Sequence, residues 1–287
     1  MKAEKDSVLV LGSSSWIGHY LLAELQKVLP SKKFLAGYSS KRPSFLSAGI
    51  DPVQISSKNP TALQSLEFQS VVHLARGEEE EDFRFLKMLI QKANQCGGRV
   101  LYASSANALD GSPKKVHLET DLALGSSPYG KFKAQCENEV LKSAKKGLVF
   151  RFSAIHGFAP NRKARTQEFL EKLKRGEKIT IPRGIVQNRL FVGDLASMIA
   201  QLVAKVETNG IWHLGTIDQS EEFHFCQRLA KLFGYEEKSI SPGKEENFSL
   251  VVRPQKFLET FPQIPLPTEE DSLQKVRQQP ELQLFRR

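Results

Sequence analysis

The sequence predicts an α/β protein with a Rossmann-type doubly wound parallel sheet and a small mixed α/β domain formed from C-terminal segments. Short apolar and β-branched runs alternate with longer helical patterns through about the first 215 residues, which is typical of stacked βαβ units. The first of these runs leads into a glycine-containing turn. A length of 287 residues fits one large or two unequal domains.

The predicted strands are the short runs of this alternation. They cover residues 7–11, 33–38, 52–55, 70–75, 99–104, 147–153 and 210–214. A further strand is predicted to end at Leu190-Phe191-Val192.

Helices are predicted between these strands. Residues 16–29 carry an apolar face at helical spacing and end before Pro30. A second helix covers about 79–94 and opens with the acidic run 78–82, which suits the positive end of a helix macrodipole better than it suits a cation site. Helices are also predicted at 166–175 and 194–205, whereas frequent prolines after Glu236 leave that part of the layout open.

Composition excludes several classes of protein. No apolar run reaches the roughly 20 residues of a membrane span, and the first six residues lack the apolar stretch of a signal peptide, so a cytoplasmic protein is expected. Three cysteines without a CxxC pair indicate neither a disulfide framework nor a zinc site, and no metal is expected. The formal net charge of +9 comes without any nucleic-acid-binding motif, so no nucleic-acid partner is expected.

The turn after the first strand has the features of a phosphate-binding turn. It reads Gly12-Ser13-Ser14-Ser15-Trp16-Ile17-Gly18 and passes directly into a helix, whose N-terminus offers unpaired N–H groups to a pyrophosphate. Gly12 permits the tight turn, and Gly18 lets the helix pack closely on the strand. Ser15 replaces the middle glycine of the pattern and narrows the approach of a pyrophosphate, so a plain strand-turn-helix without a ligand stays open as an alternative.

The residues after the second strand indicate which dinucleotide is bound. No acidic residue lies between Glu24 and Asp51 to meet the ribose hydroxyl of NAD, whereas Ser39-Ser40-Lys41-Arg42 supplies two hydroxyls and two cations. We expect Lys41 and Arg42 to bind the 2′-phosphate, so that NADP(H) is preferred and NAD(H) is possible. A solvated loop is the alternative.

A catalytic group is predicted further along the chain. Tyr129 and Lys133 are four residues apart and share one helix face, where an ammonium next to a phenol favours the phenolate and fits it for acid/base work. Ser105 follows the fifth strand, at the sheet edge where open parallel sheets bind ligands, and can hold a reacting carbonyl oxygen.

Together these motifs resemble those of the extended, or atypical, short-chain dehydrogenases/reductases, a family of nucleotide-sugar epimerases, reductases and dehydratases. The resemblance covers residues 7–234 and is carried, in family order, by the glycine turn, Val71-Val72-His73-Leu74-Ala75, Leu101-Tyr102-Ala103-Ser104-Ser105-Ala106, Ser127-Pro128-Tyr129-Gly130-Lys131-Phe132-Lys133, Arg151-Phe152-Ser153-Ala154-Ile155-His156-Gly157 and Phe191-Val192-Gly193-Asp194-Leu195-Ala196. It implies a Rossmann domain at 1–157 plus about 185–217, and a small substrate-binding domain at 158–184 and 218–287. It also implies that family members commonly dimerise, so a homodimer is possible.

The resemblance further implies roles for single residues. Tyr129 is the acid/base, Lys133 binds the nicotinamide ribose and tunes Tyr129, and Ser105 orients the substrate oxygen. The implied cofactor contacts, besides Tyr129 and Lys133, are Gly12, Ser14, Ser15, Trp16, Ile17, Gly18, Ser39, Lys41, Arg42, Leu74, Ala75, Arg76, Phe152 and Ile155. The implied substrate contacts are Ser105, Ala106, Asn107, His156, Arg162 and Arg189.

Within the family, the residues after the catalytic hydroxyl separate the reactions. Dehydratases carry Asp-Glu there, so Ala106-Asn107 disfavours dehydration. The tail Leu109-Asp110-Gly111 is similar to the dTDP-dehydrorhamnose reductase branch, whereas Ser105-Ala106 is similar to epimerases. We therefore expect an NAD(P)-dependent oxidoreductase that reduces or epimerises a nucleotide-linked sugar. The alternative is a non-catalytic NADP-binding regulator of the same fold.

The positive charge is concentrated in one segment. The segment from Arg151 to Arg189 contains ten Lys and Arg residues and three glutamates, so it carries a net charge of +7 out of the total of +9. Because this segment enters the implied substrate domain, we interpret the charge as a site for a small anionic substrate, with a solvated helix face around residues 172–175 as the alternative for part of it.

Overall fold

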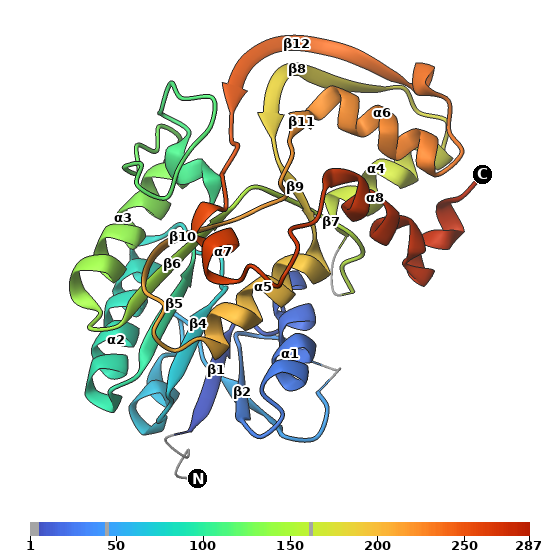
Figure 1. Cartoon of the computed structure of the whole chain (residues 1–287). Helices are drawn as coiled ribbons and strands as arrows, with labels where there is room; N and C mark the ends of the chain where they lie inside the picture. Colours follow the sequence, from blue (N-terminus) through green and yellow to red (C-terminus); the bar gives the residue numbers. More distant parts are fainter. Residues whose placement is uncertain (1–5, 44–45, 161–162) are drawn as a thin grey trace.

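A seven-stranded sheet runs through the larger part of the molecule (Figure 1). The structure is a computed structural model that describes residues 6–43, 46–160 and 163–287. Every strand pair of this sheet is parallel, and the order is β10-β6-β5-β4-β1-β2-β3. The strands are β1 (Ser7–Leu11), β2 (Lys33–Tyr38), β3 (Ile50–Gln54), β4 (Ser70–His73), β5 (Arg99–Ala103), β6 (Gly147–Phe152) and β10 (Gly210–Leu214). The order of β1 to β6 is that of doubly wound dinucleotide-binding sheets, which confirms the predicted fold.

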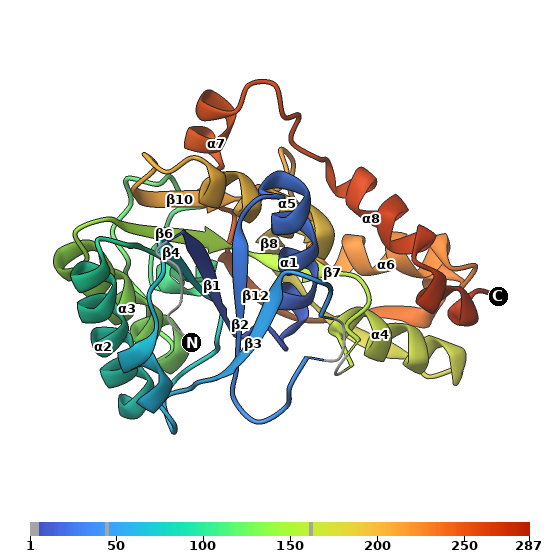
Figure 2. The same ribbon diagram turned by 90° about the horizontal axis from the view of Figure 1, so that it is seen from below.

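Helices cover both faces of this sheet. Val8 and Val10 of β1 face a core that includes α1 (Trp16–Val28) and α5 (Val192–Ala204). Leu9 and Leu11 face the opposite core, and its helices are α2 (Glu80–Cys96) and α3 (Pro128–Ser143). Figure 2 shows the two pairs of helices on either side of the strands. Because both faces are buried, the inner strands β1, β4, β5 and β6 are mostly apolar runs, which explains why the sequence pattern located them.

Two predicted starts differ from the structure by two residues. β3 begins at Ile50 rather than at residue 52, because Pro52 lies within an edge strand, where a missing N–H need not interrupt the ladder. Helix α5 begins at Val192, two residues before the predicted start. Asp194 thus lies in its first turn, where a carboxylate suits the macrodipole, and pairs with Lys275 at 2.6 Å.

A second, smaller cluster of elements follows the sixth strand. Its sheet has the order β11-β8-β12, with β8 (Ile179–Gln187), β11 (Ser220–Glu221) and β12 (Ile240–Ser249). Helices α4 (Arg165–Lys174), α6 (Glu222–Leu232) and α8 (Glu269–Gln278), with the 3-10 turn η4 (Pro280–Phe285), pack into one apolar core with it. Two short parallel strands, β7 (Ala154–His156) and β9 (Arg189–Phe191), lie where the chain passes between the two clusters (Figure 1).

The chain returns to the large sheet before it ends. Helix α7 (Gln255–Thr260) places Phe257 in the core shared with α1 and α5. The remaining short elements are 3-10 turns, η1 (Thr61–Ser65), η2 (Ala106–Leu109) and η3 (Glu237–Ser239). Across the described ranges, no helix combines the length and the apolarity that a bilayer crossing demands.

Candidate active site

The glycine turn lies at the carboxyl edge of the large sheet. Gly12 has a φ of +80°, and a Cβ at this position would lie 2.9 Å from the backbone nitrogen of Ala75. A Cβ on Gly18 would lie 2.4 Å from the carbonyl oxygen of Gly12. Only glycine fits either position, as the sequence predicts, and the turn therefore packs directly against the end of β4.

Ser15 acts as the N-cap of α1. Its Oγ accepts a hydrogen bond from the Gly18 N–H at 3.1 Å, while its own N–H donates to the Gly12 carbonyl at 2.9 Å. Helix geometry leaves the N–H groups of Trp16 and Ile17 without intrahelical acceptors. Two backbone donors at a positive helix end are thus available, and the turn fits a pyrophosphate even with serine in its middle position.

The Trp16 side chain does not cover this turn. It is buried against Ala159, Ala164 and Val192, at the junction with the smaller cluster. Only the backbone of Trp16 is placed for the contact that the sequence predicts. The remaining turn residues differ in exposure: Ser13 is buried and donates to the Gly37 carbonyl at 2.9 Å, whereas Ser14 and Ile17 are half-buried.

The basic pair after β2 lies close to the turn. The N–H groups of Gly12 and Ser13 both donate to the Gly37 carbonyl at 3.0 Å, which joins the turn to the end of β2. Ser39, Lys41 and Arg42 follow within five residues and are exposed. The charges predicted to meet a 2′-phosphate are therefore in solvent, at the same edge as the glycine turn.

Ser105 and Tyr129 are brought together from different elements. Ser105 caps the 3-10 turn η2, donating to Asn107 Oδ1 at 3.1 Å and accepting from the Asn107 N–H at 3.2 Å. Tyr129 lies in the first turn of α3, and the Ser105 hydroxyl is near enough to lower the pKa of its phenol. The two hydroxyls thus lie near each other at the carboxyl end of β5.

Asp110 fixes this arrangement. Its carboxylate accepts from the backbone N–H groups of Ser126 and Ser127 and from both of their hydroxyls. Asp110 is the C-cap of η2, whose N-cap is Ser105, so these bonds join that turn to the start of α3, where Tyr129 lies. They also lower the pKa of Asp110 below its ordinary value despite partial burial. The sequence showed Asp110 only as part of a family-like tail, not as a positioning residue.

Lys133 lies beneath the pair. It is buried, and its ammonium donates to the Tyr102 hydroxyl and to the Ala103 carbonyl, both at 3.0 Å. One of its three protons remains for another acceptor. Burial lowers the pKa of Lys133 to about 8, and the ammonium is 5.7 Å from the centre of the Tyr129 ring.

The Tyr129 phenol responds to several neighbours. Burial raises its pKa above the ordinary value. The Arg76 guanidinium and the Ser105 hydroxyl lower that pKa, whereas Glu78 and Cys136 raise it. The guanidinium of Arg76 lies 5.0 Å from the centre of the Tyr129 ring.

A buried ion pair supports the same strand end. The Ser104 hydroxyl donates to Glu137, which also pairs with Arg151 at 2.6 Å, and Glu137 and Arg151 are both almost fully buried. Sequence reasoning missed this pair. Glu137 lies one helical turn after Lys133, a spacing that could have revealed it.

The other predicted cofactor contacts line the carboxyl edge in different ways. Leu74 is buried and continues β4 by donating its N–H to the Leu11 carbonyl at 2.9 Å, and Ala75 meets the glycine turn. Phe152, at the end of β6, is half-buried and stacks on Phe150, and Ile155 is half-buried beside Trp16.

The predicted substrate residues are divided by the structure. Asn107 is half-buried next to Ser105, whereas Ala106 is buried beneath it. His156 is turned into the smaller core, 4.4 Å from the Phe225 ring centre and 3.3 Å from the Thr166 hydroxyl, and burial lowers its pKa to about 3. The prediction that His156 faces the substrate is corrected accordingly. Arg162 lies outside the described residues.

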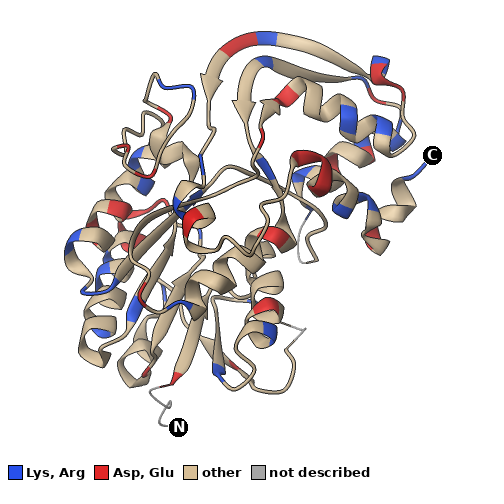
Figure 3. Ribbon diagram, viewed as in Figure 1, with Lys and Arg blue, Asp and Glu red and all other residues tan. Residues whose placement is uncertain are grey.

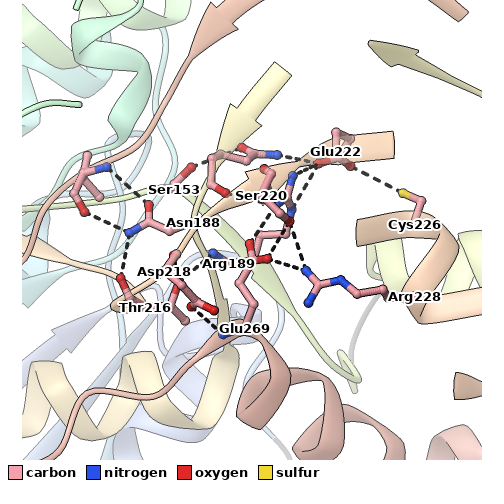
Figure 4. A network of polar contacts seen from close by, with 12 residues as sticks. Ser153, Asn188, Arg189, Thr216, Asp218, Ser220, Glu222, Cys226, Arg228 and Glu269 are labelled. Atoms are coloured by element: carbon pink, nitrogen blue, oxygen red, sulfur yellow. Dashed lines mark hydrogen bonds and ion pairs between the residues drawn. The ribbon is translucent and has the colours of Figure 1, made fainter. Parts of the chain in front are cut away.

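Arg189 also differs from the prediction. It is completely buried, and its guanidinium pairs with Glu222 and Glu269, both at 2.8 Å (Figure 4). It also donates to the carbonyls of Gln187 and Ser220, both at 3.0 Å. With these acceptors around it, Arg189 has a structural role and is not placed to bind a substrate phosphate.

Much of the positive charge in the 151–189 segment is paired. Arg151 pairs with Glu137, Arg183 with Glu221, and Arg189 with two glutamates, all of which lie outside that segment. Figure 3 shows blue and red segments interspersed over β8, β12, α6 and α8. The local sum of +7 therefore does not describe a single positive surface.

Within the described part of the chain, no three His, Cys, Asp or Glu side chains are grouped to hold a metal ion. The reacting groups that the site offers are a serine hydroxyl, a phenol and an ammonium.

Comparisons with known proteins agree with this architecture. A family model described as the RmlD substrate binding domain matches residues 61–256. No curated protein matches the sequence.

Solved structures with similar folds include three nucleotide-sugar enzymes. The dTDP-glucose 4,6-dehydratase of Bacillus anthracis, in complex with NAD, gives a TM-score of 0.80 at 16% identity and covers 95% of each chain. The dTDP-4-dehydrorhamnose reductase of the same organism, in complex with NADP, gives 0.78 at 16% identity, over 95% of this chain and 99% of that one. The UDP-glucuronic acid 4-epimerase of Bacillus cereus, in complex with NAD, gives 0.74 at 16% identity, over 94% and 95%. At these identities the similarity shows the fold.

Proposed function

Because the chain belongs to the family of the RmlD substrate binding domain, and so to the extended short-chain dehydrogenases/reductases, we propose that it is an NADP-preferring oxidoreductase acting on a nucleotide-linked sugar. The observation that carries this proposal is the grouping of Ser105, Tyr129 and Lys133 at the carboxyl end of β5. The glycine turn lies at the same sheet edge, two strands away through β4.

The proposed chemistry uses the Ser105 and Tyr129 hydroxyls as one unit. When bound, the nicotinamide supplies or accepts the hydride. Ser105 holds the carbonyl or carbinol oxygen of the substrate by a hydrogen bond, and Tyr129 gives that oxygen its proton, or takes it in the reverse direction. The Lys133 ammonium stabilises the phenolate that remains, and its third proton is available to a ribose hydroxyl.

Residues around Ser105 support reduction or epimerisation through a keto intermediate. The position after Ser105 is the buried Ala106, and the next is Asn107, whose amide already accepts from Ser105. Neither supplies the additional acid and base that elimination of water needs. The nucleotide-linked sugar is proposed from the family and from the substrates named for its structural neighbours.

Ligands retained by the purified protein test this proposal. We expect mass spectrometry of the denatured protein to detect NADP(H) released from the chain. Release of NAD(H) alone would contradict the preference, and a protein that neither retains nor binds either dinucleotide would contradict the function.

Cofactor preference depends on Lys41 and Arg42. Replacing both with alanine is expected to weaken NADPH binding by about tenfold or more, because two charge-assisted contacts to the 2′-phosphate are lost. NADH, which lacks that phosphate, is expected to bind with nearly unchanged affinity. Fluorescence titration with both dinucleotides measures the effect, and Lys27→Ala, which removes an exposed lysine from α1, serves as the control. Tighter binding of NADH than of NADPH by the unaltered protein would contradict the preference.

Ser15 supports one alternative. A side chain in the middle of the turn is compatible with a cofactor-binding regulator that has lost turnover. The grouping of the Ser105 and Tyr129 hydroxyls with the Lys133 ammonium favours an enzyme instead. Turnover of any keto-sugar nucleotide with NADPH separates the two functions.

A further inference from the structure

Arg76 lies over the phenol of Tyr129, outside the group of Ser105, Tyr129 and Lys133. Its guanidinium carbon is 5.0 Å from the ring centre. The same guanidinium donates a hydrogen bond from Nε to Glu78 Oε1 at 2.7 Å, and its Nη2 forms an ion pair with that oxygen at 2.6 Å. The sequence pattern predicted a cofactor contact at this position and gave no sign of a contact with Tyr129.

The start of α2 holds the Glu78 clamp in place. The Asp82 carboxylate, in the first turn of that helix, accepts from the backbone N–H groups of Glu78 at 3.1 Å and Glu79 at 3.2 Å. This part of the acidic run thus caps the helix and fixes the backbone of the turn after β4. The backbone from which Glu78 projects is therefore fixed, although the side chains of Arg76 and Glu78 are both exposed.

Lys133 is less available than Arg76 to interact with the Tyr129 phenol. Its ammonium is 5.7 Å from the ring centre and already donates to Tyr102 and Ala103. Burial also favours its neutral form, whereas an arginine stays charged throughout the working pH range. Of the two cations near the ring, Arg76 is therefore the nearer one and the one whose charge is permanent.

We propose that Arg76 is a positioning residue for Tyr129: held by Glu78, its guanidinium orients the ring and favours the phenolate, and Glu78 moderates that effect. This inference rests on the proposed function, because it gives Arg76 a role through the acid/base group of that reaction. The face of an aromatic ring attracts a cation, and a positive charge close to a phenol stabilises its ionised form.

Other groups also lie near Tyr129. From β5, Tyr102 interacts electrostatically with it, and from α3 the Lys133 ammonium lies 5.7 Å from its ring centre. Cys136, also on α3, raises the pKa of Tyr129, whereas the Ser105 hydroxyl lowers that pKa. Among the described groups that influence the pKa of Tyr129, Arg76 and Glu78 are the exposed ones, so each can be replaced without opening the core.

The test follows the ionisation of Tyr129 without any substrate. Tyrosine labelled with ¹³C at Cζ reports each phenol by NMR, and Tyr129→Phe assigns the resonance among the five tyrosines. We expect Arg76→Gln to move the Tyr129 midpoint upward, Glu78→Gln to move it downward, and Arg76→Lys to stay close to the unaltered protein. Arg84→Gln, which removes an exposed arginine paired with Glu80 on the same helix, is the matched control and should leave the midpoint unchanged.

Opposite shifts from the two members of one clamp are not expected from a general disturbance of the fold. An unchanged midpoint in Arg76→Gln, or shifts in the same direction in Arg76→Gln and Glu78→Gln, would overturn the inference. If Arg76→Gln does not fold, Glu78→Gln alone tests the inference. A Tyr129 midpoint that does not move downward in Glu78→Gln would overturn it. Since the titration needs neither cofactor nor substrate, absence of turnover would reject the proposed function without affecting this result.

Discussion

Replacing Tyr129 with phenylalanine is expected to lower turnover by about 10²–10⁴-fold, which is the usual contribution of a positioned acid/base group. The phenol is the only group proposed to exchange a proton with the substrate oxygen, and the Ser105 hydroxyl next to it is held by Asn107 rather than by a base. The aromatic ring remains in the variant, so the packing of Arg76 and the capped start of α3 are retained. NADPH affinity should therefore stay close to that of the unaltered protein.

Rates at saturating substrate and NADPH titrations, measured on the same samples, check this expectation. Tyr235→Phe is a suitable control, because it removes a phenol hydroxyl that donates to the Phe285 carbonyl in the smaller cluster, away from the site. The control should lose some stability and no turnover. Comparable turnover in Tyr129→Phe and the unaltered protein would exclude Tyr129 as the acid/base.

Replacing Arg189 with leucine is expected to lower the free energy of unfolding by about 3–5 kcal/mol, because it leaves partners of a buried charge uncompensated. Glu269 is almost fully buried, and Glu222 is about a quarter exposed. Burial alone would raise the pKa of Glu222, and Arg189 holds that pKa below its ordinary value. Arg228 also pairs with Glu269, at 2.5 Å, so Glu269 would keep one cation in the variant (Figure 4).

Urea unfolding measures this loss as a lower midpoint with an unchanged slope. Arg175→Leu is the matched control, since Arg175 is exposed and pairs only with Glu177, its neighbour two residues away, among the described contacts. Exposed pairs of this kind contribute about 0–1 kcal/mol. A loss of unfolding free energy below about 1 kcal/mol for Arg189→Leu, or a stable variant with weakened substrate binding, would contradict the structural role of Arg189 and favour the predicted substrate contact.

The strands of the large sheet could be predicted from the sequence because their physical signal is local. A strand buried on both faces must be apolar along its length, as Val8-Leu9-Val10-Leu11 is. The glycine turn could also be predicted from the sequence, because Gly12 and Gly18 lie against backbone atoms that leave no room for a Cβ. The strand β12 lacks such a signal: it is an edge strand, and its central residues Gly243-Lys244-Glu245-Glu246 are mostly exposed.

Partners distant in the sequence explain what could not be predicted of the site. Arg189 looks like a free cation when its own segment is considered, yet its carboxylate partners lie 33 and 80 residues further along. His156 follows a strand that ends at the cofactor edge, but Phe225 of α6 and Thr166 of α4 draw its ring into the smaller core. The contact between Arg76 and Tyr129 could not be predicted for the same reason, because the two residues are 53 positions apart in the sequence.

We propose that the chain transfers a hydride between a nicotinamide dinucleotide and a nucleotide-linked sugar, with Tyr129 as the acid/base group. Two incubations test this transfer: NADPH deuterated at the transferable position with a mixture of nucleotide-linked keto-sugars, and NADP⁺ with a mixture of nucleotide sugars, each followed by chromatography and mass spectrometry. We predict that one keto-sugar gains a single deuterium in the first incubation, or that one nucleotide sugar changes its isomer in the second, and that Tyr129→Phe with the dinucleotide bound produces neither change. A protein saturated with dinucleotide that neither labels a keto-sugar nor isomerises a nucleotide sugar would contradict the proposed function.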